Sequence, residues 1–531
     1  MTNTASPHHA DKPRGGPLAG VRVVELAGIG PVPLAGMLLA DLGADVVRVD
    51  RPGNIPIIPP QTDITSRGKR SVVVDLKHER GAGVVLDLAA RADVLIEGLR
   101  PGVTERLGIG PDDCWARNPA LVYGRMTGWG QDGPLAHSAG HDIAYIAITG
   151  ALHAIGRAGG PPQIPVNYLG DFGGGSMFLV VGVMAALWES RASGRGQVVD
   201  AAIVDGTASL QAMTYSMLAS SLWRDERGVN SLDSGAPYYD VYETADGRHM
   251  GVGAIEPKFY AEFVRVLFDG APPDEVSDRG AGGGVERVRS EIAKRFLTRT
   301  QEEWAAVFEG TDACVAPVLT LGEAPGHPHL AARATYVEAG GITQPGVAPR
   351  FSRTPGTAGA IELPGAHSRE VLADWDVGDA AALLDAGVVR EGPLRASQPA
   401  PVRHRTGWAC PARGYWRLYA LLAASDAEPA PAFVPAPLVV EPGEEDEPGD
   451  DPGRPELMGP DFMEPEPMEP IEPEPMEPEL MGPELMESEL MAPESAGIWP
   501  SGVAWSTMCG STCATWSAIC AGGRPVDCAI C

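Results

Sequence analysis

Basic side chains, evenly spread cysteines and long apolar runs are all scarce in this 531-residue chain. Lysine and arginine number 41 against 70 aspartates and glutamates, and the net charge of −29 disfavours nucleic acid and anionic membranes as partners. No apolar run reaches the length of about 18 residues that a membrane-spanning helix needs, so we expect none. Met1–Gly16 is polar and lacks the apolar core of a secretory signal. Together with a C-terminus, Ala-Ile-Cys, that lacks a peroxisomal tripeptide, these absences predict a cytoplasmic protein.

Only two of the eight cysteines, Cys114 and Cys314, lie in the regularly patterned part of the chain. Two thiols this far apart are typical of a reducing compartment and exclude a disulfide framework. Near the C-terminus, Cys528 and Cys531 have the spacing of half a zinc site. No second close pair at zinc-finger spacing and no nearby histidine completes it, so we predict no metal site.

The composition changes from about residue 391. Residues 441–496 hold 20 acidic residues against one basic residue, Arg454, and 13 prolines in repeated Met-Glu-Pro and Glu-Leu-Met units. Proline at this density interrupts helices and sheets. We expect 391–531 to be a solvated, disordered tail; a partner-docking segment is the alternative, without specific support.

Strand-like and helix-like stretches alternate between residues 17 and 130. The run Val21–Leu26 is followed by a Gly/Pro turn, the helix-like Leu34–Leu42 and the strand-like Asp45–Asp50. This alternation predicts the α/β class, with a doubly wound, mostly parallel sheet that binds ligand beyond the carboxyl ends of its strands. The further predicted strands are Ser71–Leu76, Asp93–Gly98 and Leu121–Arg125.

The first strand and turn partly match a dinucleotide-binding fingerprint. Gly28 and Gly30 have the right spacing, but Pro33 stands where the third glycine belongs. That glycine permits the close helix–strand approach that seats a pyrophosphate, so we expect no nicotinamide cofactor.

A second unit begins near residue 231. Two alternating runs, Tyr239–Thr244 and Arg248–Ala254, flank Asp246-Gly247 and predict a β-hairpin, with helices to follow near 257–268, 286–297 and 301–309. Between the two units, 131–175 is glycine-rich and loop-like, and 201–222 has helical spacing. The predicted organisation is an N-terminal extension (1–16), a large domain (17–225), a small α+β domain (226–330), a return segment to the large domain (331–390) and the tail (391–531).

Three acid–base residues stand in glycine-rich or turn settings. His141 follows Gly140, Asp171 precedes Phe172 and three glycines, and Glu256 lies where a strand passes into a helix. Each has an ordinary alternative, because a carboxylate at a helix start is favoured by the helix dipole and a loop histidine is common. Spacing alone leaves both interpretations open.

Several motifs resemble the α-methylacyl-CoA racemase branch of the family III CoA-transferase superfamily, over roughly residues 17–390. The resemblance implies a large doubly wound domain and a small domain, in two interlocked subunits that form each active site between the large domain of one and the small domain of the other. The motifs are Pro17–Pro52, RGKRSVVVDLK (67–77), EGLRPGVTERL (97–107), GRMTGWGQDG (124–133), Gly140–Ile148, GDFGGGSMF (170–178) and Gly235–Pro257.

The resemblance also implies an activity: interconversion of (2R)- and (2S)-2-methylacyl-CoA through an enolate, with CoA as part of the substrate and no other cofactor. His141 and Asp171 match the two acid/base residues, and Glu256 matches the carboxylate that orients the histidine. The Asp142 N–H and the Asn167 side chain match the donors to the enolate oxygen. Tyr239 matches a position near the site, although packing within its strand explains it equally well.

By the same resemblance, the CoA phosphates and adenosine lie among basic residues, since arginine pairs bidentately with phosphate. Met126 and Met177 suit a permissive apolar acyl surface. The basic candidates are Arg51, Arg67, Lys69, Arg70, Arg100 and Arg106.

The main rival activity is CoA transfer between carboxylic acids. By resemblance, Asp171 would then be the nucleophile and would form an aspartyl–CoA thioester. The triplet Gly140-His141-Asp142 favours the racemase, because transferases generally carry another residue in the place of His141. A third possibility, a non-catalytic acyl-CoA-binding or scaffold protein, is disfavoured by the intact set of acid–base residues.

Overall fold

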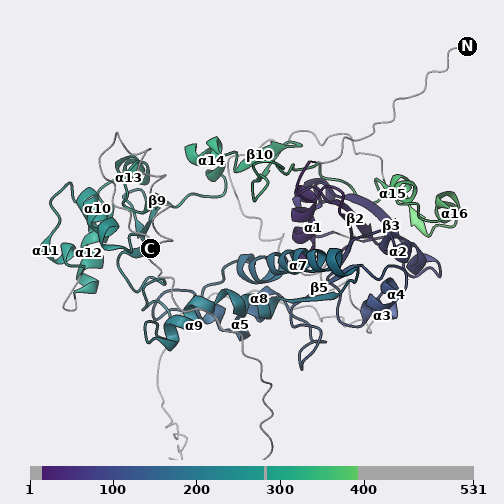
Figure 1. The fold of residues 1–531 in the computed structure, drawn as a ribbon. Helices are drawn as coiled ribbons and strands as arrows, with labels where there is room; N and C mark the ends of the chain where they lie inside the picture. Colours follow the sequence, from purple (N-terminus) through teal and green to yellow (C-terminus); the bar gives the residue numbers. More distant parts are fainter. Residues whose placement is uncertain (1–14, 55, 280–283, 393–531) are drawn as a thin grey trace, which may run out of the picture. The chain divides into compact units, whose positions relative to one another are not determined.

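The computed structural model describes residues 15–392 except 55 and 280–283 (Figure 1). All of these lie in one of the two compact units of the chain. The predictions for the tail and for the terminal cysteines concern residues 393–531, outside the described part, as do those for residues 1–14.

A seven-stranded sheet forms the centre of the large domain, in the order β12-β3-β2-β1-β4-β5-β6. Every neighbouring pair is parallel except β12, which joins β3 antiparallel and brings the end of the described chain back to this sheet. The chain runs outward from β1 to β3, then restarts at β4 on the other side of β1. This reversal is the switch point of a doubly wound fold, which confirms the predicted class. The strands are β1 (Arg22–Leu26), β2 (Asp45–Asp50), β3 (Arg70–Val74), β4 (Val94–Glu97), β5 (Val122–Thr127), β6 (Val198–Ala202) and β12 (Val389–Arg390).

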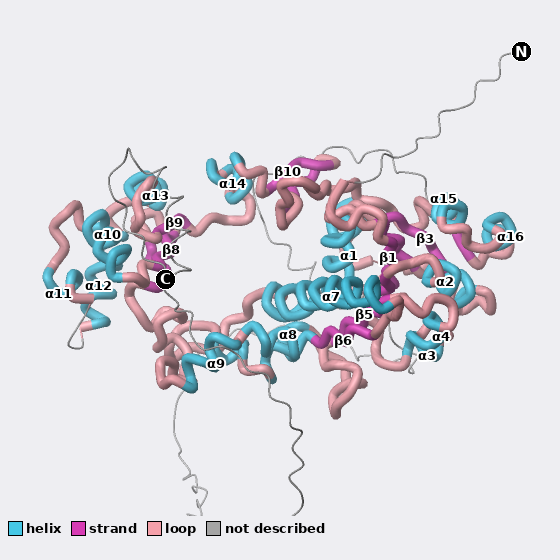
Figure 2. Tube along the Cα trace, in the orientation of Figure 1, coloured by secondary structure: helices cyan, strands magenta, loops and turns pink. Residues whose placement is uncertain are grey.

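Helices cover both faces of this sheet (Figure 2). Because both faces are buried, the strands are nearly continuous valine and leucine runs and do not alternate apolar with polar residues. One face packs against α1 (Pro31–Asp41) and α7 (Met177–Ser193). The other packs against α2 (Gly81–Ala89), α4 (Pro111–Trp115), α15 (Ser368–Asp374) and α16 (Ala380–Asp385).

The region from 231 has its own sheet and its own core. The predicted hairpin is confirmed as β7 (Tyr239–Glu243) and β8 (His249–Gly253), with β9 (Val315–Pro317) paired antiparallel to β8. An aromatic cluster that includes Phe263, Phe296 and Trp304 fills the core beneath it. The surrounding helices are α10 (Pro257–Leu267), α11 (Asp274–Ser277), α12 (Val285–Phe296) and α13 (Gln301–Phe308).

The remaining elements are short. A second hairpin pairs β10 (Tyr336–Ala339) with β11 (Ile342–Pro345) in the return segment. The others are α3 (Val103–Arg106), α14 (Pro328–Ala332), η1 (Pro60–Thr62), η2 (Ile64–Ser66) and η4 (Ala324–Gly326).

The glycine-rich region 131–175 is more regular than the sequence predicts. It contains α5 (Asp142–Ile148), α6 (Ala151–Ala154) and a π-helix, η3 (Tyr168–Ser176). The glycines of η3 lower its helix propensity but allow close packing: a Cβ at Gly174 would lie 2.7 Å from the backbone nitrogen of Thr207, and on the facing helix a Cβ at Gly206 would lie 1.9 Å from the Gly174 carbonyl oxygen. A tertiary contact thus stabilises a helix that local propensity does not indicate.

The prediction that a helix begins at residue 201 is wrong. The chain first forms β6 against β5 and only then α8 (Ile203–Leu210) and α9 (Ala212–Ala219). The strand signal is masked because β6 contributes only Ala201 and Ala202 to the buried layer before the helix begins.

One described helix, Tyr168–Ser193, is long and apolar enough to cross a membrane, although the sequence analysis predicts no such helix. It comprises η3 and α7, and Leu179 and Val183 are buried in the layer that covers the large sheet. Its contacts with β5 and β6 account for the apolar residues on the side that faces the sheet, whereas Met177, Val181 and Trp188 of the same helix are exposed.

Candidate active site

The carboxyl ends of the parallel strands meet at one edge of the large sheet. Arg51 directly follows β2, and Arg100 follows β4 by three residues, so the two lie on either side of the switch point. Their guanidinium groups are exposed, as is that of Arg106 at the end of α3. Among the described residues none of the three forms an ion pair, and Arg51 only reaches the side chain of Asn54, at 3.4 Å. This edge therefore offers unpaired positive charge where doubly wound folds bind ligands.

Asp171 lies in the first turn of η3 and is held at both its backbone and its side chain. Its N–H donates to Oδ1 of Asp142 at 2.7 Å, and its Oδ2 accepts from Nδ2 of Asn167 at 3.3 Å. Gly30, with φ 77°, brings the β1–α1 turn against it: a Cβ on Gly30 would lie 3.5 Å from Asp171 Oδ2. The carboxylate is thus fixed in a glycine-lined environment.

Burial is the main cause of a raised pKa at Asp171, and the neighbouring Asp142 adds to it. The hydrogen bond from Asn167 and, to a smaller extent, the charge of His141 act in the opposite direction. The chain brings His141 near this carboxylate, because it directly precedes Asp142, whose Oδ1 accepts from the Asp171 N–H. Asp142 itself is buried, its pKa is raised by that burial, and its Oδ2 has no hydrogen-bond partner among the described residues.

His141 is the exposed residue immediately before α5, and Glu256 holds the same place before α10. Both stand at N-cap positions, yet neither side chain makes a capping hydrogen bond. The helix-cap alternative for Glu256 therefore explains the position of the residue and not its side chain.

The structure brings His141, Asp142, Asn167 and Asp171 together, but not the two candidates from the small domain. Within the described part of the chain, no hydrogen bond or ion pair joins Glu256 to His141. Tyr239 is half-buried on β7. Sequence reasoning named the N–H of Asp142 but missed its carboxylate as the acceptor for Asp171, and only the proximity of the two motifs in space reveals it.

The three basic candidates around β3 all have partners inside the protein. Arg67 pairs with Asp41 at 2.6 Å and Lys69 with Glu25 at 2.6 Å, each with a side chain 1% exposed. Arg70 is bonded to Asp45 and Asp374. These ion pairs account for the three cations without a phosphate.

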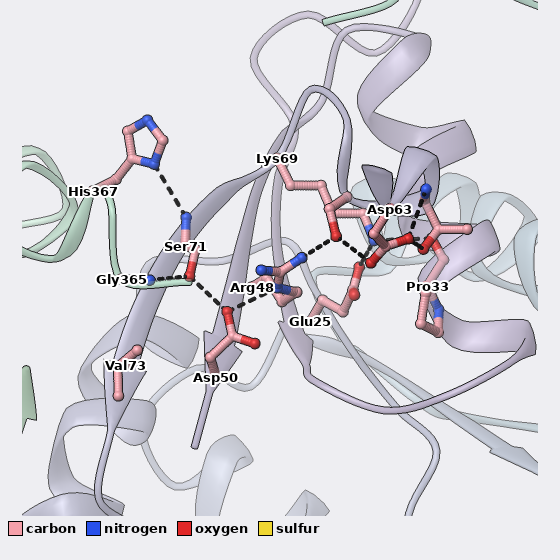
Figure 3. Close-up of polar contacts among 12 residues, drawn as sticks. Glu25, Pro33, Arg48, Asp50, Asp63, Lys69, Ser71, Val73, Gly365 and His367 are labelled. Atoms are coloured by element: carbon pink, nitrogen blue, oxygen red, sulfur yellow. Dashed lines mark hydrogen bonds and ion pairs between the residues drawn. The ribbon is translucent and has the colours of Figure 1, made fainter. Parts of the chain in front are cut away.

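Figure 3 shows Lys69 among the polar side chains of the network beneath β1–β3, where its Nζ donates to Glu25 Oε2 at 2.6 Å. Its Nζ also donates to the Pro33 carbonyl at 2.8 Å, which ties α1 to the strands. On the neighbouring strand Arg48 bonds to Asp50, which accepts in turn from the Ser71 hydroxyl at 2.6 Å. The network is structural and lies below the exposed edge.

A family model, CoA-transferase family III, matches residues 18–367. The chain therefore belongs to that family. Over 361 residues it is 45% identical to alpha-methylacyl-CoA racemase of Mus musculus, covering 67% of this chain and 93% of that protein. The racemase of Homo sapiens is 42% identical over 363 residues with the same coverage. Among solved structures, a CAIB/BAIF family protein from Brucella suis matches with a TM-score of 0.60 at 26% identity, over 68% of this chain and all of that one.

We predict that Lys69→Met destabilises the fold, because it leaves the carboxylate of Glu25 buried and unpaired. The free energy of unfolding should fall by about 3–5 kcal/mol, measured by chemical denaturation. Adding Glu25→Gln, which neutralises the orphaned group, should recover part of the loss. A variant that keeps its stability but loses CoA affinity would instead place Lys69 in the ligand site.

We predict that Asp171→Asn stabilises the protein at neutral pH. A folded-state pKa raised above the unfolded value means that ionising Asp171 costs more in the folded state, so the penalty is present at high pH and vanishes below about pH 4. Thermal unfolding of both proteins across this range should show a gain that shrinks as the pH falls. Asp87→Asn, at an exposed carboxylate paired with Arg117, serves as the control; a gain independent of pH would contradict the prediction.

Proposed function

We propose that this protein interconverts (2R)- and (2S)-2-methylacyl-CoA thioesters by two-base proton transfer. The observation that carries the proposal is the carboxylate of Asp171, fixed by Asp142 and Asn167 within electrostatic reach of His141. The family and the 42–45% identity to racemases support it.

Racemisation at carbon 2 requires removing a weakly acidic proton beside the thioester carbonyl and returning one to the opposite face. A neutral His141 takes the carbon-2 proton from one epimer, while a protonated Asp171 donates a proton to the opposite face of the enolate. With His141 protonated and Asp171 ionised, the same two residues convert the other epimer. The raised pKa of Asp171 favours the protonated form that donation needs.

The enolate oxygen needs hydrogen-bond donors as negative charge develops on it. Asp142 is the first residue of α5, where a backbone N–H has no acceptor within the helix. The second proposed donor is Asn167 Nδ2, which in this structure donates to Asp171 Oδ2.

The same site accounts for the CoA moiety without a separate cofactor. Arg51, Arg100 and Arg106 supply exposed positive charge at the carboxyl edge of the sheet for its phosphates. For the acyl chain, Met177 is 48% exposed at the start of α7, whereas Met126 is buried.

We further propose that the active protein is a homodimer with a shared site. Among the described residues of one chain, no hydrogen bond or ion pair joins Glu256 to His141, so in the proposal Glu256 of the partner subunit orients the histidine. A large apolar surface supports a second copy as the occupant, because a monomer rarely leaves such a surface in water. On α7 it comprises Met177, Val181, Met184 and Trp188, which recur at helical spacing, and α9 adds the exposed side chains of Met213 and Tyr215.

Incubating one epimer of a 2-methylacyl-CoA with the protein in D2O should place deuterium at carbon 2 and erase optical purity, followed by mass and chiral analysis. His141→Ala and Asp171→Ala should each slow racemisation by about 10²–10⁴-fold, because each removes one acid–base group. Each variant should retain some exchange on the face that the remaining base serves. No exchange, with CoA transfer once a free carboxylic acid is added, would make Asp171 a nucleophile and the protein a transferase.

A shared site predicts complementation between two inactive variants. Co-expressed Asp171→Asn and Glu256→Gln chains form heterodimers with one fully intact site, so random pairing at equal amounts should restore about a quarter of the wild-type activity. Asp171→Asn paired with His141→Ala is the control, since both changes lie in the large-domain half and no intact site can form. Equal inactivity of both mixtures would show that each chain builds its own site.

A further inference from the structure

A buried glutamate closes the carboxyl end of β4. Glu97 is fully buried, and its Oε2 accepts from the N–H of Leu99 at 2.6 Å. Its Oε1 accepts from Nε of Arg125, on the neighbouring strand β5, at 3.0 Å. The first turn beyond β4 is therefore tied to a side chain of the sheet.

The other end of the same guanidinium holds the helix that follows. Arg125 donates through one terminal nitrogen to Glu105 Oε1 at 2.7 Å and through the other to Thr104 Oγ1 at 3.2 Å. The Arg125 guanidinium thus links Glu97, which directly precedes segment 98–106, to α3, which lies at the end of that segment. We name these three partners together, Glu97, Arg125 and Glu105, the β4–α3 clamp.

The segment held in this way carries two of the unpaired cations of the site. Arg100 and Arg106 are exposed, while the Arg125 side chain is 8% exposed and already bonded on both sides. Arg125 is therefore shielded from a ligand that the other two can reach. Between them the backbone turns at Gly102 with φ 79°, a conformation that glycine adopts at no steric cost, so the turn alone does not fix Arg100 relative to Arg106 and the side-chain ties to Arg125 must do so.

We propose that Glu97 and Arg125 are positioning residues that hold Arg100 and Arg106 for the phosphate groups of the CoA nucleotide. The inference rests on the proposed function, since it assigns part of that substrate. Its physical basis is preorganisation: an arginine whose backbone is already fixed loses less entropy when it binds an anion.

Two substrates separate this role from a general structural one. Acyl-CoA carries the nucleotide phosphates, whereas the matching acyl-pantetheine thioester lacks the nucleotide. Glu97→Gln removes a charged partner of Arg125 and should raise KM for the acyl-CoA about 10-fold with kcat within about 2-fold. For the acyl-pantetheine, kcat/KM should stay within about 2-fold of wild type.

Glu105→Gln is the second variant, chosen to fold even if Glu97→Gln does not. Its side chain is 46% exposed, so it should shift KM in the same direction by about 3-fold. Asp87→Asn, which breaks an exposed pair with Arg117 in the same domain, should change neither substrate's constants.

An equal loss with both thioesters, or a fall in kcat with KM unchanged, would overturn the positioning role. If wild type exchanges neither thioester, the proposed function fails on its own, and calorimetric titration with free CoA then decides the inference. Weaker CoA binding by Glu97→Gln and Glu105→Gln, with Asp87→Asn unchanged, would support the clamp; unaltered binding by all three would refute it.

Discussion

A buried cation has to be matched by a carboxylate, and this requirement organises the large domain. Lys69 with Glu25, Arg67 with Asp41 and Arg125 with Glu97 join strands and helices far apart in the chain. Each charge loses its water on folding, so only close pairing and further hydrogen bonds make its burial tolerable. The cost shows at Glu97, where burial raises the pKa to about 7 despite its bonds to Arg125 and Leu99.

The same requirement separates structural cations from cations free to bind a ligand. Arg67 and Lys69 belong to a motif whose family resemblance suggests phosphate contacts, yet both form ion pairs inside the protein. Arg51 and Arg100 leave their strands at the carboxyl edge and keep their charge exposed. The second group is the one that we propose for a ligand with several phosphates, while the first keeps the strands and α1 in register beneath it.

The sequence alone could not predict these buried ion pairs. Hydrophobic spacing and turn residues predicted the doubly wound sheet and the hairpin around Asp246-Gly247, because those signals are local. The pairing of Lys69 with Glu25 spans 44 positions, and no local pattern encodes it. The π-helix at 168–176 likewise depends on the fit between Gly174 and Gly206. The motifs indicated His141 and Asp171 as candidates, but the hydrogen bond that joins Asp142 to Asp171 needed the fold.

Carboxylates divide by the same rule as cations. Glu97 is bonded to the guanidinium group of Arg125, and Glu25 is bonded to the ammonium group of Lys69. A cationic partner at this distance favours the ionised form of a carboxylate. Asp171 and Glu256 have no ion pair among the described residues, and Asp171 is bonded instead by a neutral amide. Burial raises the pKa of Asp171, and the hydrogen bond from Asn167 and the charge of His141 offset that effect only in part. Because proton transfer requires a group that can take up a proton as well as release it, the raised pKa of Asp171 suits this carboxylate to the role, whereas Glu256 is proposed to orient the histidine.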